Sequence, residues 1–219
     1  MSLAPRSPRI ALIHALAHSV APINEAMARD WPQARRMNLL DDSLSADLAA
    51  SGRLDAAMHE RFQSLARYAV DCGSDAILFT CSAFGPCIEA VASRQAPLPV
   101  LKPNEAMIAE AAAMGLRVGL VATFAPTLDS MRPEFPKAGE LECAVAEGAL
   151  AALDAGDAER HDALIAQKAV ELAKRGCGVI ALAQFSMARA RSRTAAATGL
   201  PVLTTVDSAV AELKRRLGA

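Results

Sequence analysis

The chain repeats itself once, and this repeat constrains the fold more than any other feature of the sequence. Four blocks recur in the same order, pairing 9–15 with 117–123, 21–27 with 125–131, 75–84 with 178–187, and 98–107 with 200–210. The first pair reads RIALIHA and RVGLVAT, and the third reads DAILFTCSAF and GVIALAQFSM. Recurrence of several blocks in one order indicates that the chain builds the same structural plan twice.

The pattern within each half predicts alternating strands and helices. Short runs rich in Val, Ile and Leu alternate with longer amphipathic stretches, such as 54–70 and 159–176. In the second stretch the apolar residues share one helical face, and Gly176 supplies a stop signal. Strand followed by helix, repeated through both halves, predicts an α/β fold of two similar doubly wound parallel-sheet lobes. We expect a pseudo-twofold to relate the lobes and an active-site cleft to lie between them.

The repeat also sets the expected domain boundaries. Lobe one is predicted to comprise residues 1–103 plus 205–219, and lobe two residues 104–204. The hinge candidates are Lys102-Pro103-Asn104 and Thr204-Thr205. A last helix, from about Val206 to Leu217, is expected to return to lobe one.

Composition limits the classes of partner. The chain has 219 residues, of which 53% are hydrophobic, and a formal net charge of −1, so it can bury a large core and carries no basic stripe for nucleic acid. No apolar stretch is long enough for a membrane span. The start resembles a secretory signal, but the repeat identifies Arg9–Ala15 as the first strand, because its counterpart opens lobe two. We therefore expect a cytoplasmic protein with a small-molecule partner.

The cysteines and glycines argue against several common sites. Five cysteines are an odd number, are scattered, and show no metal-ligand spacing, so neither a disulfide framework nor a metal site is expected. The chain has no glycine-rich nucleotide motif and no lysine in a recognisable Schiff-base context. We expect no cofactor.

The carboxyl ends of the predicted strands are the expected location of the site, because ligands bind there in open parallel sheets. Cys81, in the stretch FTCSAFGPC, comes directly after one such strand. His14 and Thr123 end the strands that open the two lobes, and the repeat places Gln184 at the position equivalent to Cys81. We expect Cys81 and Gln184 on opposite walls of one cleft.

The loop after Cys81 is suited to anions. Ser82, Ala83 and Gly85 are small enough for backbone N–H groups to point at a ligand, and Pro86 fits the first turn of a helix. The positive end of that helix favours a bound carboxylate and favours the thiolate over the thiol. The alternative is that Cys81 is a core residue, as free cysteines often are. Structural roles are expected for the other four cysteines.

Other polar residues allow two interpretations. His14 is a base or oriented hydrogen-bond donor, or else a structural histidine. His59 and His161 lie on amphipathic helices and are expected to be solvated. The hydroxyls of Thr123 and Thr127 can hold a carboxylate, or Thr127 only starts a helix.

These residues resemble the aspartate/glutamate racemase superfamily, which also includes hydantoin racemases, maleate isomerases and arylmalonate decarboxylases. The resemblance covers nearly the whole chain and rests on FTCSAFG, GLVATFAPT and IALAQFSMA. It implies cofactor-free chemistry at a carbon next to a carboxylate, with two cysteines flanking that carbon in the racemases. The first cysteine maps onto Cys81. The second maps onto Gln184, which departs from the pattern because an amide does not titrate usefully.

The resemblance implies a racemase or isomerase that acts on a small carboxylate or amino acid, with Cys81 as base or nucleophile. His14 is a second candidate for proton transfer, and Gln184 can donate a hydrogen bond to an oxyanion. The residues expected to bind substrate are Ser82, Ala83, Thr123, Thr127 and Ser186. We also expect a homo-oligomer.

Two alternatives remain open. The first is a lyase of the decarboxylase type that uses the single thiol to protonate an enolate on one face. The second is a catalytically silent binding protein, since two lobes around a cleft also describe small-molecule sensors. Turnover and binding measured on the same ligand distinguish these alternatives.

Overall fold

The computed structural model describes residues 7–136 and 140–219. Contacts divide the chain into unit 1, which runs to Lys102 and includes Val210–Ala219, and unit 2, Pro103–Ala209. The final helix, α10 (Thr205–Leu217), spans the second boundary, so its first residues belong to unit 2 and the rest to unit 1. From the sequence, this whole helix is predicted to belong to lobe one.

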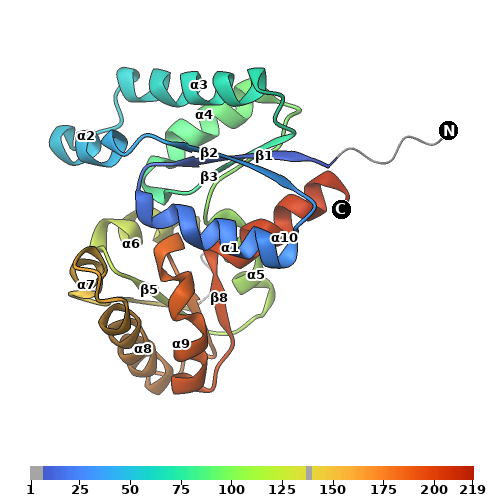
Figure 1. The fold of residues 1–219 in the computed structure, drawn as a ribbon. Coiled ribbons are helices and arrows are strands. Elements are labelled where there is room, and N and C mark those ends of the chain that lie inside the picture. The colour runs from blue at the N-terminus through green and yellow to red at the C-terminus, as the bar shows by residue number, and fades with distance from the viewer. Residues whose placement is uncertain (1–6, 137–139) are drawn as a thin grey trace. The chain divides into compact units, whose positions relative to one another are not determined.

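Unit 1 is a parallel sheet with helices on both faces (Figure 1). Its strands, in the spatial order β2-β1-β3-β4, are β1 (Arg9–His14), β2 (Arg35–Leu40), β3 (Ala76–Phe79) and β4 (Val100–Leu101). Its complete helices and 3₁₀ turns are η1 (Ala17–Ser19), α1 (Val20–Asp30), α2 (Ser43–Ser51), α3 (Ala56–Asp71), η2 (Ser82–Phe84) and α4 (Gly85–Gln95). Figure 1 shows α3 and α4 on one face of the sheet and α1 on the other.

Unit 2 repeats this arrangement. Its strands, in the order β6-β5-β7-β8, are β5 (Val118–Ala122), β6 (Leu141–Val145), β7 (Val179–Leu182) and β8 (Val202–Thr204). Its complete helices and 3₁₀ turns are α5 (Glu105–Ala113), α6 (Ala125–Met131), η3 (Arg132–Glu134), α7 (Ala149–Asp154), α8 (Ala158–Lys174), η4 (Phe185–Ala190) and α9 (Arg191–Thr198).

The two strand orders are the same once β1 is matched with β5, which confirms the predicted α/β fold of two similar parallel-sheet lobes. The hydrogen bonds agree residue by residue. The Thr80 N–H donates to the Ile13 carbonyl at 3.0 Å, and the Ala183 N–H donates to the Val121 carbonyl at 2.9 Å. The predicted pseudo-twofold and cleft stay predictions.

The central strands form because their sequences are apolar on both faces. Every residue of β3, β5 and β7 is buried, as expected for parallel strands covered by helices on each side. The two long helices begin at capping carboxylates. Asp55 accepts from the Met58 N–H at 2.9 Å before α3, and Asp157 accepts from the Arg160 N–H at 3.0 Å before α8.

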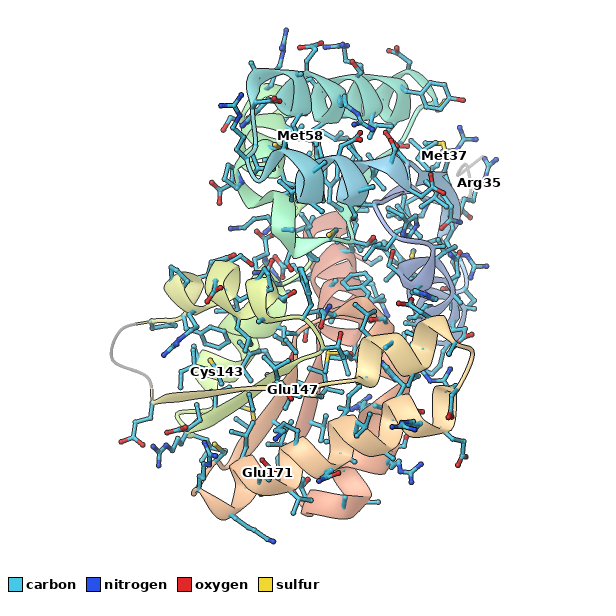
Figure 2. All side chains as sticks on the ribbon, turned by 90° about the vertical axis from the view of Figure 1, so that its left-hand side faces the viewer. Arg35, Met37, Met58, Cys143, Glu147 and Glu171 are labelled. Atoms are coloured by element: carbon cyan, nitrogen blue, oxygen red, sulfur yellow. The ribbon has the colours of Figure 1, made fainter. Side chains whose placement is uncertain are left out.

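Each unit has its own hydrophobic core. In unit 1, α3 and α4 pack on the sheet through buried residues that include Phe62, Phe79 and Phe84. Met58 on α3 is buried in this core and Met37 on β2 packs at its border; both are labelled in Figure 2. In unit 2 one cluster joins α5 and α6 to the sheet, and another joins α7, α8 and α9 to it.

The edge strand of unit 1 is short of apolar residues. β2 extends to Leu40 and includes Asn38, and Ser43 begins α2. The edge strand β2 alternates exposed and half-buried residues, so it lacks the continuous apolar run that marks the central strands.

No helix in the part of the chain that the structure describes combines the length and the apolar character that crossing a membrane requires.

A substitution in β5 tests the packing of unit 2. A Cβ atom added at Gly119 would lie 3.0 Å from Ile180 Cδ1 and 3.1 Å from Leu172 Cβ. The Ile180 methyl group can rotate, but the Leu172 Cβ is fixed to the backbone of α8, so the helix must shift. We expect Gly119→Ala to lower the free energy of unfolding by about 1–3 kcal/mol in urea titrations, the usual cost of overpacking.

Gly85→Ala is the control for stability, because a Cβ at Gly85 meets no atom within 4 Å and the residue already has right-handed helical angles. An unchanged midpoint for Gly119→Ala would mean that α8 does not pack this closely on β5.

Candidate active site

The candidate site of unit 1 lies where its strand order switches. Strands β1 and β3 are neighbours in the middle of the sheet, and their connections lead to opposite sides of it. β1 ends at His14 and β3 at Phe79, with Thr80 and Cys81 next. Ligands in doubly wound sheets bind at this carboxyl edge. The predicted strand-end positions of His14 and Cys81 are therefore confirmed.

The Cys81 side chain borders the apolar core. Along a strand, side chains alternate between faces, so Cys81 continues the face of Phe79. It is half-buried and packs against the cluster in which the Phe62 ring lies 5.2 Å from the ring of Phe79 and 4.9 Å from that of Phe84. A narrow crevice lies beside the Cys81 side chain. The residues around it are Ile13, His14, Ala15, Leu44, Phe62, Phe79 and Cys81.

This setting determines the protonation of Cys81. Burial raises the pKa of its thiol above the ordinary value, and a hydrogen bond from the Ala83 backbone N–H opposes the rise without reversing it. From the sequence, the helix after Cys81 is expected to favour the thiolate. Cys81 instead precedes the 3₁₀ turn η2, and α4 begins only at Gly85, so the apolar neighbours outweigh the helix end.

The loop after Cys81 has the predicted small residues, in different environments. Ser82 is half-buried and Ala83 is exposed, while the Ala83 N–H is directed at the thiol. Pro86 lies in the first turn of α4, as predicted. Whether Ser82 and Ala83 bind a carboxylate stays a prediction.

His14 is fully buried and hydrogen-bonded at both ring nitrogens. Its Nδ1 lies 3.0 Å from the hydroxyls of both Ser19 and Thr80, and these two hydroxyls are 2.9 Å apart. Its Nε2 lies 3.0 Å from Asn38 Oδ1. Ser19, Thr80 and Asn38 are not evident as site residues from the sequence, because their significance depends on where the strands bring them.

The amide side chains of Asn24 and Asn38 determine which ring nitrogen of His14 carries the hydrogen. Asn24 Nδ2 donates to the Val20 carbonyl at 2.7 Å, which fixes the orientation of the Asn24 amide, and it also donates to Asn38 Oδ1 at 2.8 Å. Asn38 Oδ1 is therefore an acceptor. The hydrogen of neutral His14 lies on Nε2 and points at Asn38, and Nδ1 accepts from a hydroxyl.

Burial lowers the pKa of His14, and the hydrogen bond to Asn38 opposes this in part. The imidazole is therefore neutral at pH 7. Both ring nitrogens of His14 are hydrogen-bonded to protein groups. The ring is therefore suited to holding Thr80, Ser19 and Asn38 in place.

In unit 2, Gln184 occupies the position equivalent to Cys81. Its Oε1 accepts from the Thr123 N–H at 2.7 Å and from the Thr123 hydroxyl at 2.9 Å. A backbone N–H can only donate, so the atom that faces it must be the oxygen of the amide. The Gln184 NH₂ group has no protein acceptor among the described residues, and the Thr123 hydroxyl hydrogen is already used.

The other residues of unit 2 that are predicted to bind substrate, Thr127 and Ser186, lie near this edge. They are not part of the hydrogen-bonded pair Thr123–Gln184. Thr127 is buried in α6, and its N–H donates to the Phe124 carbonyl at 3.1 Å. Ser186 is half-buried on η4. Their contacts with substrate stay predictions.

His161 corrects the expectation that the helix histidines are solvated, because its side chain is fully buried. Its Nδ1 lies 2.8 Å from Asp162 Oδ1, which also accepts from Arg189 Nε at 3.0 Å. This cluster ties α8 to η4, the turn that comes after Gln184.

Within residues 7–136 and 140–219, no group of three or more His, Cys, Asp or Glu side chains is arranged to hold a metal ion.

The neutral state of His14 makes a prediction about acid stability. Because its pKa is lowered by folding, the unfolded chain binds more protons below the ordinary histidine pKa of about 6.5. The contribution of His14 is complete above that pH and is lost as the pH falls toward the folded pKa. We expect the free energy of unfolding of wild type to fall more steeply from pH ~7.5 to pH ~5 than that of His14→Gln.

Urea unfolding at several pH values measures both slopes, and subtracting them cancels the other histidines. Equal slopes would show that His14 titrates alike in the folded and unfolded chains.

The family model for Asp/Glu/hydantoin racemases matches residues 17–213. No curated protein sequence matches the chain.

Solved structures match over nearly the whole chain. Allantoin racemase from Klebsiella pneumoniae is 20% identical with a TM-score of 0.74, covering 97% of this chain and 89% of that one. Aspartate racemase from Picrophilus torridus is 12% identical with a TM-score of 0.75, covering 97% and 95%. A point mutant of arylmalonate decarboxylase is 16% identical with a TM-score of 0.67, covering 97% and 94%. The family match spans most of the chain, and the chain belongs to the Asp/Glu/hydantoin racemase family.

Proposed function

We propose that this chain is a cofactor-independent racemase or isomerase that moves a proton at the carbon next to a carboxylate of a small acid or amino acid. Cys81 is the group that transfers the proton. The observation that carries the proposal is a thiol at the carboxyl end of β3, at the point where the strand order of a family-type sheet switches.

The raised pKa of Cys81 has two effects on such chemistry. It lowers the fraction of thiolate at pH 7, and it makes the thiolate that does form a stronger base. In the exchange reaction the thiolate removes the proton from the substrate carbon, and the electron pair of the broken C–H bond passes into an enolate. The resulting thiol exchanges its proton with solvent and then returns a solvent-derived proton to the same carbon, which restores the thiolate.

Gln184 supplies hydrogen bonds in place of a second thiol. Thr123 holds its oxygen from two directions, so its NH₂ group has a fixed direction and can only donate. A fixed donor is suited to a carboxylate or to the oxyanion of an enolate. We assign carboxylate recognition on unit 2 to Gln184 and a positioning role to Thr123.

A lyase of the decarboxylase type is the second candidate, and the protonated state of Cys81 favours it. Loss of carbon dioxide leaves its bonding electron pair on the substrate as an enolate. A thiol can then give its proton to one face of that carbon, and solvent restores the thiol.

One experiment distinguishes these functions. A panel of amino, hydroxy, dicarboxylic and malonic acids is incubated with the protein in D₂O and followed by proton NMR and chiral chromatography. Loss of the signal of the hydrogen next to the carboxylate indicates exchange, appearance of the other enantiomer indicates inversion, and a new monoacid indicates decarboxylation. Binding without any of these changes would contradict the proposed enzyme.

Replacing Cys81 tests its role directly. We expect Cys81→Ala to lower kcat on the best substrate by about 10²-fold to 10⁴-fold, as is typical when an acid–base group is lost. Cys143→Ala is the matched control, because Cys143 is also half-buried but lies on strand β6 (Figure 2). If Cys81→Ala keeps the wild-type rate, another group carries the proton.

Replacing Gln184 tests whether the missing second thiol limits the reaction. Wild type is expected to exchange deuterium into one enantiomer with little inversion, because an amide does not transfer the second proton. Gln184→Cys is expected to raise the ratio of inversion to exchange, whereas Gln184→Ala removes the amide without adding a thiol and is expected to leave the ratio low. Rapid inversion by wild type, as fast as exchange, would contradict this account.

A further inference from the structure

A buried polar pair lies behind Cys81 on the other face of the sheet. Thr80 and His14 are neighbours across β3 and β1, with exposed fractions of 6% and 0%. Burying an imidazole and a hydroxyl is costly unless both are hydrogen-bonded. Because the Ser19 hydroxyl donates to the Leu16 carbonyl, the hydroxyl that donates to His14 Nδ1 is that of Thr80, at 3.0 Å, and the Ser19 oxygen lies 3.0 Å from Nδ1 and 2.9 Å from the Thr80 hydroxyl. Such a pair is present either because the fold needs it or because the site does.

Unit 2 shows what the fold alone requires. The equivalent backbone bonds, from Thr80 to Ile13 and from Ala183 to Val121, match His14 with Ala122 and Thr80 with Ala183. Both alanines are buried in one apolar cluster of unit 2. The same strand pairing therefore forms with two methyl groups at these positions, so joining the strands does not by itself explain His14 and Thr80.

The connection after β1 is the second difference. In unit 2, β5 ends at Ala122 and α6 begins at Ala125. In unit 1 the connection from His14 to Val20 is longer and includes the turn η1. Ser19 fastens this longer segment, because its hydroxyl donates to the Leu16 carbonyl at 2.7 Å and contacts both His14 and Thr80.

We propose that His14 is a positioning residue that acts through Thr80 and Ser19 to hold the Cys81 backbone and the segment Ala15–Ser19 in fixed relation. Thr80 is the residue directly before Cys81, so its side-chain bonds constrain the peptide that carries the thiol. Ser19 brings the extra segment to the same carboxyl edge. His14 connects the two, and Asn38 fixes the ring from its other side.

The position of the thiol affects the rate of the proposed reaction. An error of about 1 Å in the position of a catalytic group can cost 10²-fold in rate. His14 and Thr80 therefore act mainly on kcat and on the reactivity of Cys81, with a smaller effect on KM. This kinetic expectation rests on the proposed function, whereas the effect on the thiol itself does not.

Variants at His14, Thr80 and Ser19 test the network. Thr80→Val removes one hydroxyl at nearly constant volume, and His14→Gln keeps an amide that can still bond to Asn38. His14→Ala combined with Thr80→Ala copies the pair that unit 2 already uses. The matched control is Thr194→Val in α9 of unit 2, because the Thr194 hydroxyl is buried with no partner among the described residues.

The first measurement is alkylation of Cys81 by iodoacetamide, followed by peptide mass spectrometry from about pH 7 to pH 10, which brackets the ordinary thiol pKa of about 8.5. We expect Thr80→Val and the double alanine variant to change the rate at Cys81 by about fivefold or more or to shift its pH profile, because thiol reactivity depends on its environment. Thr194→Val is expected to match wild type.

The second measurement is amide hydrogen exchange of residues 15–20, which we expect to accelerate in Ser19→Ala, Thr80→Val and the double variant. On a substrate identified in the D₂O panel, kcat is expected to fall by about 10-fold to 10²-fold with a smaller change in KM, and His14→Gln to retain more kcat than His14→Ala.

The outcomes separate this proposal from the proposed function. If Thr80→Val and the double variant match Thr194→Val both in Cys81 alkylation and in exchange of the segment, the positioning role is overturned, whether or not the protein turns over a substrate. If both physical signals change but wild type acts on no acid in the panel, the positioning role stands and the proposed function fails.

Discussion

The pairing of the two central strands in each sheet determines where every candidate residue lies. Thr80 bonds to Ile13 in unit 1 as Ala183 bonds to Val121 in unit 2. Because parallel strands have one register that buries their apolar residues, this bond leaves little freedom to the residue that comes after it. Cys81 and Gln184 are each that next residue, so each lies at the carboxyl edge of its own sheet.

The same pairing then distributes polar groups differently in the two units. In unit 1 the pair on one face is His14 with Thr80, and the other face presents Cys81 near Ala15. In unit 2 the first pair is two alanines, and the second face presents Gln184 held by Thr123. In unit 1 the polar pair lies on the face of the sheet opposite the Cys81 thiol. In unit 2 Thr123 bonds directly to the Gln184 amide on the same face. The same backbone arrangement therefore carries different polar residues at the carboxyl edges of the two sheets.

The sequence predicts the strand ends well, because Val- and Leu-rich runs and their repetition are local patterns. It does not predict partners that come from different elements, such as Ser19 and Asn38 around His14. It also misjudges the net effect on Cys81, since a helix start is visible in the sequence, whereas the core cluster that buries the thiol is assembled from several elements, including α3, β3 and η2. The burial of His161 is not predicted either, because an amphipathic pattern does not show which helices cover a residue.

Under the proposed function, the unequal edges also limit the reactions that the chain can complete. Cys81 is then the group that transfers the proton, whereas both His14 nitrogens are engaged and the Gln184 NH₂ group only donates hydrogen bonds. A single thiol can exchange or deliver one proton per turnover, because solvent can reset it between turnovers. Inversion needs a second group on the opposite face of the carbon. The ratio of inversion to exchange therefore measures how far water can act as that second group.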